Sequence, residues 1–222
     1  MSGWKSIIAE HSGYPQPEGD FTWFFSVYDI SNGCSTCGIG KIQKSPFKVK
    51  GFPAKKQNHF FCLNWVNDEL FISNEIKECF EAEQITGIKF IHPIGYVTGF
   101  EITDYWQIII SDCIDRKVEN NNLIEEKCEM PKDSKQVKFL KANKSRLVEG
   151  PFCGSIKYNF PQTEGFIYKK EAFSDCNDFM KSNEWFGSGG SSSKATFISD
   201  KVYRIISKNK FKGMHFTEVI LI

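Results

Sequence analysis

Hydrophobic and polar residues follow the clearest pattern between residues 70 and 94. Residues 70–72 are apolar and predict a short strand, and Ser73 follows them as a natural N-cap for a helix. Gly87 ends the helical pattern, and residues 88–91 alternate as a strand does. The segment is predicted to be a strand, a helix of about ten residues and a second strand. The apolar stripe of the helix consists of Ile76, Cys79, Phe80 and Ile85.

The same pattern recurs near the C-terminus at a constant offset of 126 residues. The matches include the helix cap and the terminating glycine as well as apolar positions. Two unrelated amphipathic segments would match at apolar positions but would less readily align both serine and glycine. An internal duplication is therefore favoured over chance similarity. The identical residues are Phe71, Ile72, Ser73, Gly87, Phe90 and Ile94, which match Phe197, Ile198, Ser199, Gly213, Phe216 and Ile220.

A cysteine-glycine turn precedes each copy. Residues 34–38 read Cys-Ser-Thr-Cys-Gly, and residues 150–154 read Gly-Pro-Phe-Cys-Gly. We therefore predict an α+β fold in which two related strand-helix-strand halves, residues 21–115 and 145–222, pack as one unit with antiparallel or mixed sheets. A polar connection, residues 116–144, joins the halves within a single domain of residues 1–222.

Local composition predicts the remaining parts of the chain. The first 20 residues are polar and rich in turn formers. Residues 21–28 are aromatic and β-branched, which predicts a strand, and the apolar residues 105–111 predict a central strand.

The spacing of Cys34 and Cys37 is suited to zinc, because two intervening residues let both thiolates reach one tetrahedral ion and Gly38 permits the turn that follows. Cys153 is the first candidate for a further ligand, since it belongs to the parallel turn. Two alternatives remain for completing a site. Either Cys128 is the fourth ligand, or a different site closes locally, since His59 and Cys62 also have a two-residue spacer. The alternative is a bare turn without metal.

Charge and hydropathy exclude several classes of protein. Lys and Arg number 28 against 27 Asp and Glu, so the chain lacks the basic excess that sequence-independent nucleic-acid binding needs. Its longest apolar run is far shorter than the roughly 20 residues that cross a bilayer. The first ten residues do not resemble a signal peptide. We therefore expect a cytoplasmic protein that contacts neither membrane nor nucleic acid, with its eight cysteines reduced.

No residue pattern indicates catalysis. The four histidines lie outside any nucleophile or metal-hydrolase motif. The glycine- and serine-rich residues 187–194 lack the Gly before and the Ser or Thr after Lys194 that a phosphate loop requires. We expect a protein that is not an enzyme and that has no catalytic residues.

These turns and the strand between the copies resemble the double-CXXCG motif family of myxobacterial paralogues. Cys34, Cys37 and Gly38 match its first motif, and Cys153 with Gly154 matches part of the second, where Gly150 replaces the first cysteine. The resemblance implies an immunity protein that neutralises a cognate polymorphic toxin by stoichiometric binding. Because Gly150 replaces a cysteine of the second motif, the two motifs do not supply four thiolates, and zinc would be held by the three cysteines with a substitute ligand. The alternative is a zinc-ribbon-like nucleic-acid-binding or regulatory module.

Overall fold

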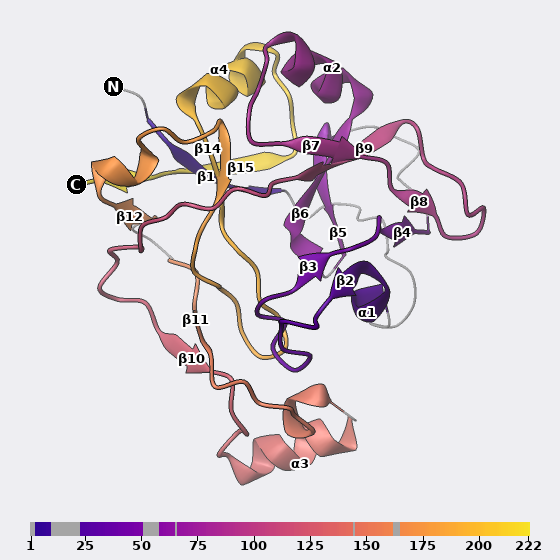
Figure 1. Ribbon diagram of the computed structural model, residues 1–222, viewed down its shortest axis with the longest axis vertical. Helices are drawn as coiled ribbons and strands as arrows, with labels where there is room; N and C mark the ends of the chain where they lie inside the picture. The colour runs from indigo at the N-terminus through magenta and orange to yellow at the C-terminus, as the bar shows by residue number, and fades with distance from the viewer. Residues whose placement is uncertain (1–2, 10–22, 51–57, 65, 144, 162–164) are drawn as a thin grey trace.

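Two four-stranded antiparallel sheets form the body of the protein. In the computed structural model, the described residues are 3–9, 23–50, 58–64, 66–143, 145–161 and 165–222 (Figure 1). The first sheet has the order β5 (Phe60–Leu63), β6 (Val66–Ser73), β9 (Tyr105–Ile109) and β7 (Lys89–Ile91). The second has the order β13 (Phe179–Lys181), β14 (Thr196–Ile198), β1 (Lys5–Ala9) and β15 (Met214–Glu218). With its helices, this architecture confirms the α+β class.

Two helices cover these sheets side by side (Figure 1). Helix α2 (Asn74–Ala82) connects β6 to β7, and α4 (Asp200–Lys208) connects β14 to β15. Ser73 and Ser199 are the N-cap residues, and the hydroxyl of Ser199 accepts a hydrogen bond from the backbone N–H of Val202. Gly87 and Gly213 follow the helices with positive φ angles of 81° and 101°. Both predicted strand-helix-strand segments are therefore confirmed.

One hydrophobic core joins the two sheets. It contains buried residues of both helices and of strands from both sheets, so the sheets pack as one unit. The shared core includes Ile7, Phe60, Ile72, Ile76, Phe80, Ile108, Phe179, Ile198, Val202 and Ile206. Side chains alternate between the two faces of a strand. Phe71, next to Ile72, and Phe197, next to Ile198, therefore point away from the shared core, and each belongs to a separate hydrophobic cluster on the other face of its sheet.

None of the described helices has the length and apolar character needed to cross a membrane.

Shorter elements surround these sheets. The shorter elements are α1 (Trp23–Val27), β2 (Tyr28–Asp29), β3 (Ile42–Gln43), β4 (Lys48–Val49), β8 (Ile94–Gly95), β10 (Glu125–Lys127), α3 (Ser134–Ala142), η1 (Arg146–Val148), β11 (Ile156–Tyr158), β12 (Ile167–Tyr168), η2 (Lys170–Phe173) and β16 (Ile220–Leu221).

Two local predictions differ from the structure. Residues 23–27 form helix α1 instead of a strand, while residues 21–22 lie outside the described part of the chain. Residues 5–9, expected to be polar and turn-rich, form β1 between β14 and β15. Lys5 is buried there, and its Nζ lies 2.7 Å from Glu218 on the neighbouring strand and 4.7 Å from the centre of the Tyr203 ring. The predicted central strand near residues 105–111 is confirmed as β9.

Candidate metal centre

The first two cysteines lie in the loop of a short hairpin. Strands β2 and β3 pair antiparallel, and the loop between them carries Cys34 and Cys37. Within this loop the backbone N–H of Gly38 donates to the carbonyl of Cys34 at 2.8 Å, and the N–H of Cys34 donates to the carbonyl of Ile39 at 2.8 Å. Gly38 and Gly40 both have φ angles of 78°, a conformation that side chains disfavour. The loop therefore folds tightly and brings the two thiols to one side.

The other two cysteines come from a second hairpin, formed by β10 and β11. Cys128 directly follows β10, and its backbone N–H donates to the carbonyl of Ser155 at 2.9 Å. In return, the N–H of Gly154 donates to the carbonyl of Cys128 at 3.1 Å. These bonds extend the hairpin by one step, so that Cys128 lies opposite Ser155 and close to Cys153.

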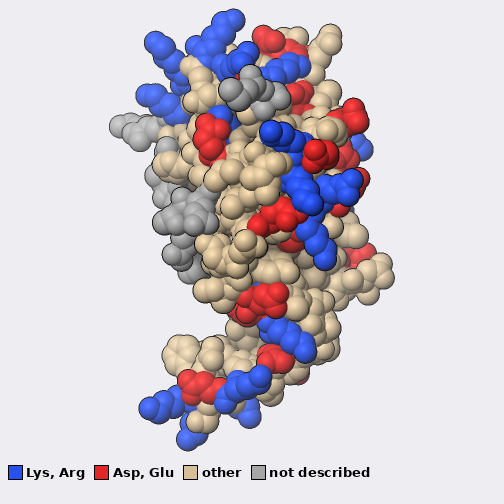
Figure 2. Space-filling view, turned by 90° about the vertical axis from the view of Figure 1, so that its left-hand side faces the viewer, with Lys and Arg blue, Asp and Glu red and all other residues tan. Residues whose placement is uncertain are grey.

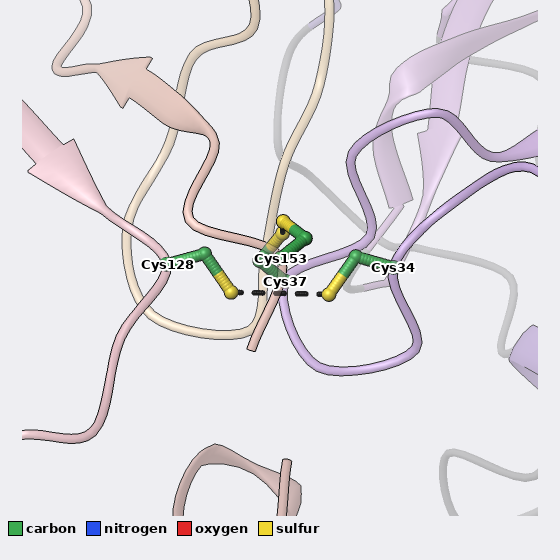
Figure 3. A group of neighbouring side chains, drawn as sticks. All are labelled: Cys34, Cys37, Cys128 and Cys153. Carbon is green, nitrogen blue, oxygen red and sulfur yellow. Dashed lines mark hydrogen bonds between the residues drawn. The ribbon is translucent and has the colours of Figure 1, made fainter. Parts of the chain in front are cut away.

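The four thiols meet in one cluster (Figure 3). Their sulfur atoms all lie within 4.8 Å of one another. The Cys34–Cys128 and Cys37–Cys153 sulfur pairs are each 3.8 Å apart. A tetrahedral zinc ion with Zn–S bonds of about 2.3 Å places its sulfurs about 3.8 Å apart. The cluster thus has nearly the dimensions of a four-thiolate zinc site before any ion is considered.

Backbone amides surround the sulfurs and favour ionisation unequally. Burial opposes ionisation of the Cys34 thiol, but N–H groups of Cys37 and Thr36 that donate to its sulfur outweigh that effect, and the pKa of Cys34 falls to about 6. Burial raises the pKa of Cys37 well above its usual value, although the N–H of Ile39 opposes this rise. Burial also raises the pKa of Cys128. A divalent cation would supply the positive charge that these two thiolates need.

The surroundings of the cluster are closed by packing and by one further hydrogen bond between the hairpins. Cys34, Cys37 and Cys128 are buried, and Ile39 and Phe152 pack against them, whereas Cys153 is exposed. The Thr36 hydroxyl donates to the carbonyl of Pro151 at 2.7 Å. Contacts of this kind orient the metal ligands and limit the access of solvent. The cluster is therefore shielded from solvent on all sides except at Cys153, whose thiol is accessible.

The structure brings together the three predicted ligands, Cys34, Cys37 and Cys153, and adds Cys128. Cys128 was one of two alternatives for closing the site. The other alternative, His59 with Cys62, lies elsewhere: the Nδ1 of His59 accepts from the backbone N–H of Lys212, and Cys62 is buried in the main core. A bare turn does not account for two more thiols converging from distant segments. Gly150 lies next to Pro151, whose carbonyl faces Cys34 at 3.5 Å from its sulfur.

A buried charge network, which the sequence did not reveal, anchors the first hairpin to the sheets. Lys41 follows the cysteine loop, and its Nζ lies 2.8 Å from Asp68 on β6. Lys181 on β13 lies 3.9 Å from Glu69, which also accepts a hydrogen bond from the Tyr28 hydroxyl at 3.2 Å. Burial opposes ionisation of Asp68, but the two lysines outweigh it and lower its pKa. Burial raises the pKa of Glu69. The network thus fixes the cysteine loop against both sheets.

Comparisons with family models and with curated proteins identify no relative of this chain. No family model matches the sequence, and no curated protein matches it at a significant level. The fold and the cluster together define an α+β protein with an all-cysteine candidate metal centre.

Proposed function

We propose that Cys34, Cys37, Cys128 and Cys153 bind one structural Zn²⁺ ion. The observation that carries this proposal is the convergence of four thiols, whose sulfur atoms all lie within 4.8 Å of one another and include two pairs 3.8 Å apart. Four thiolates complete the tetrahedral shell and leave no coordination position for water or substrate, as is typical of structural sites. The ion would tie the β2/β3 hairpin to the β10/β11 hairpin. Metal analysis of the purified chain should find one zinc per molecule, and a chain without metal would contradict the proposal.

We propose that the protein acts by stoichiometric binding, as a cytoplasmic immunity protein that neutralises a cognate toxin domain. Two features support this role. The cysteine-glycine turns at Cys34, Cys37 and Cys153 resemble those of the double-CXXCG family, and the four-thiol centre is of the structural and not the catalytic type. Thiolate ligands also require reduced cysteines, which persist in the cytoplasm.

Co-expression tests this function directly. The chain is produced together with the toxin domain encoded beside its gene, and both cell growth and complex formation are measured. Restored growth and a complex of fixed stoichiometry are expected. Unrelieved toxicity with no complex would contradict the proposal.

A duplicated unit accounts for the architecture, and we propose it as the origin of the two sheets. Each strand-helix-strand segment leaves a gap that another strand fills, β9 in the first sheet and β1 in the second. The contacts between the segments are reciprocal. The N–H of Phe60 donates to the carbonyl of Lys212 at 3.0 Å, and the N–H of Phe179 donates to that of Thr86 at 3.2 Å. Thr86 and Lys212 are again 126 residues apart, which supports the duplication.

One observation favours the second candidate function, a zinc-ribbon-like nucleic-acid-binding module. The β2/β3 loop carries Cys34 and Cys37 at the two-residue spacing of zinc-ribbon ligands, although 24 residues separate Cys128 from Cys153. The near balance of positive and negative charge favours the immunity role, because polyanion binding needs a basic excess. Oligonucleotide binding separates the two candidates.

A further inference from the structure

Residues 129–152 form an arm between the ligands Cys128 and Cys153. The β10/β11 hairpin carries this arm, and α3 and η1 lie beyond the hairpin, away from the sheets (Figure 1). None of the residues of α3 is buried; Val137 and Leu140 are partly covered. Short helices gain most of their stability from packing an apolar face against the rest of the protein. Helix α3 buries almost none of its surface, so it adds little to the stability of the fold. The side chains that α3 presents to solvent therefore need another explanation.

The exposed face of α3 is basic and carries one aromatic side chain. The arm contains six basic and three acidic residues, a net charge of +3 in a chain whose total is +1. Lys135, Lys138 and Lys141 are exposed at intervals of three residues, and no ion pair to them occurs among the described residues. Figure 2 shows blue side chains spread along the arm at the bottom of the view. The arm thus concentrates the positive charge that the whole chain lacks.

Phe139 is the aromatic residue of this face, and it is 67% exposed. It lies one helical turn after Lys135, and the two side chains are therefore neighbours on the helix surface. The helix is capped at both ends: the Asp133 side chain accepts from the N–H of Lys135, and the Asn143 side chain donates to the carbonyl of Phe139. These caps stabilise the helical backbone that carries the lysines and the phenyl ring.

We propose that α3 is the docking surface for an acidic surface of the toxin domain, with Phe139 as the anchor, Lys135 and Lys138 beside it, and Lys141 farther round the helix. This inference rests on the proposed immunity function. Interfaces gain most of their affinity from a few buried aromatic anchors, while surrounding charges steer association and select the partner. Three lysines would neutralise at most three phosphates, which favours a protein partner over a nucleic acid.

The metal centre would position this surface. Cys128 and Cys153 lie at the base of the arm, and the cluster joins that base to the loop of Cys34 and Cys37. The ion would therefore fix the direction of α3 relative to the sheets. Loss of metal should weaken toxin binding even if the sheets remain folded.

Binding kinetics of the full chain with the toxin domain encoded beside its gene test the inference. The variant with Lys135→Glu, Lys138→Glu and Lys141→Glu should associate at least tenfold more slowly at low salt. A matched control is the variant with Lys89→Glu, Lys208→Glu and Lys210→Glu, whose exposed lysines lie on or next to β7 and α4, at the far end of the molecule (Figure 1). This control carries the same total charge and should associate at the rate of the wild type.

The aromatic anchor has its own matched pair. Phe139→Ala should weaken toxin binding at least tenfold, whereas Phe100→Ala, at a residue 77% exposed near β8, should leave it unchanged. Thermal melts of all variants establish that each is folded. Equal binding by arm and control variants would overturn the inference while leaving the immunity function standing, and absence of binding by the wild type would overturn both. Binding of a labelled dT20 oligonucleotide that the arm variants lose would assign the arm to nucleic acid and also overturn the inference.

Discussion

Replacing Cys128 with Ser should remove the metal from the centre. The backbone hydrogen bonds of Cys128 with Ser155 and Gly154 stay in place, so the hairpin stem is not disturbed directly. The cluster loses one of its four thiolates and the hydroxyl that replaces it is a poor ligand for zinc. The link between Cys128 and Cys34 is then broken.

The expected loss of stability follows from the separation of these two residues. They lie 94 residues apart in the chain. A covalent link that closes a loop of this length stabilises a protein by about 4–5 kcal/mol in chain-entropy models, and we take the metal link as comparable. For a protein of this size, 1 kcal/mol corresponds to roughly 2–4 °C in Tm. The Cys128→Ser variant should therefore melt about 8–20 °C below the zinc-loaded wild type.

Differential scanning calorimetry with and without a chelator provides the assay. Chelation should lower the Tm of the wild type and leave that of Cys128→Ser unchanged. Cys176→Ser is the matched control, because Cys176 lies outside the cluster and its thiol donates to the carbonyl of Ala172, a bond that a hydroxyl can replace. Equal Tm values for the two variants, each with the same response to chelator, would refute the reasoning.

Three further predictions concern the framework around the centre. Asp68→Asn should destabilise the protein at pH 7 by about 3–5 kcal/mol, because buried Lys41 loses its partner. Folding lowers the pKa of Asp68, so its ionised carboxylate stabilises the protein above the unfolded pKa of about 4, and this stabilisation is lost as pH falls through the folded pKa. Urea melts should therefore show that the difference in unfolding free energy between wild type and variant shrinks in acid. Gly87→Ala and Gly213→Ala should each cost at least about 2 kcal/mol more than Gly99→Ala, since all three have positive φ but only the first two would place a Cβ against a carbonyl oxygen of β13 or β5. Equal costs in chemical denaturation would contradict the reciprocal packing of the two segments.

The helices α2 and α4 were predictable because their apolar spacing, serine caps and terminal glycines all indicate the same structure. Local signals failed where tertiary packing decides. Strand β1 begins with Lys5 and Ser6, which are polar in sequence but buried between two strands. The aromatic residues 23–27 have strand propensity, yet they form a helix whose Phe24 and Val27 pack into the cluster below β6.

The candidate site was predictable only in part for a similar reason. Cys34, Cys37 and Cys153 lie in recognisable turns, whereas Cys128 has no cysteine or histidine at metal-binding spacing around it. It reaches the cluster because β10 pairs with β11. This pairing joins segments about 30 residues apart, and no local sequence pattern indicates it. The buried network of Lys41, Asp68 and Lys181 likewise joins residues from three separate segments.

X-ray absorption spectroscopy at the zinc edge tests the central claim most directly. For the purified, zinc-loaded chain, the account predicts one zinc per molecule with four sulfur neighbours at about 2.3 Å and no nitrogen or oxygen neighbour. A first shell that contains nitrogen or oxygen, or a zinc content well below one per chain, would contradict a centre formed by Cys34, Cys37, Cys128 and Cys153.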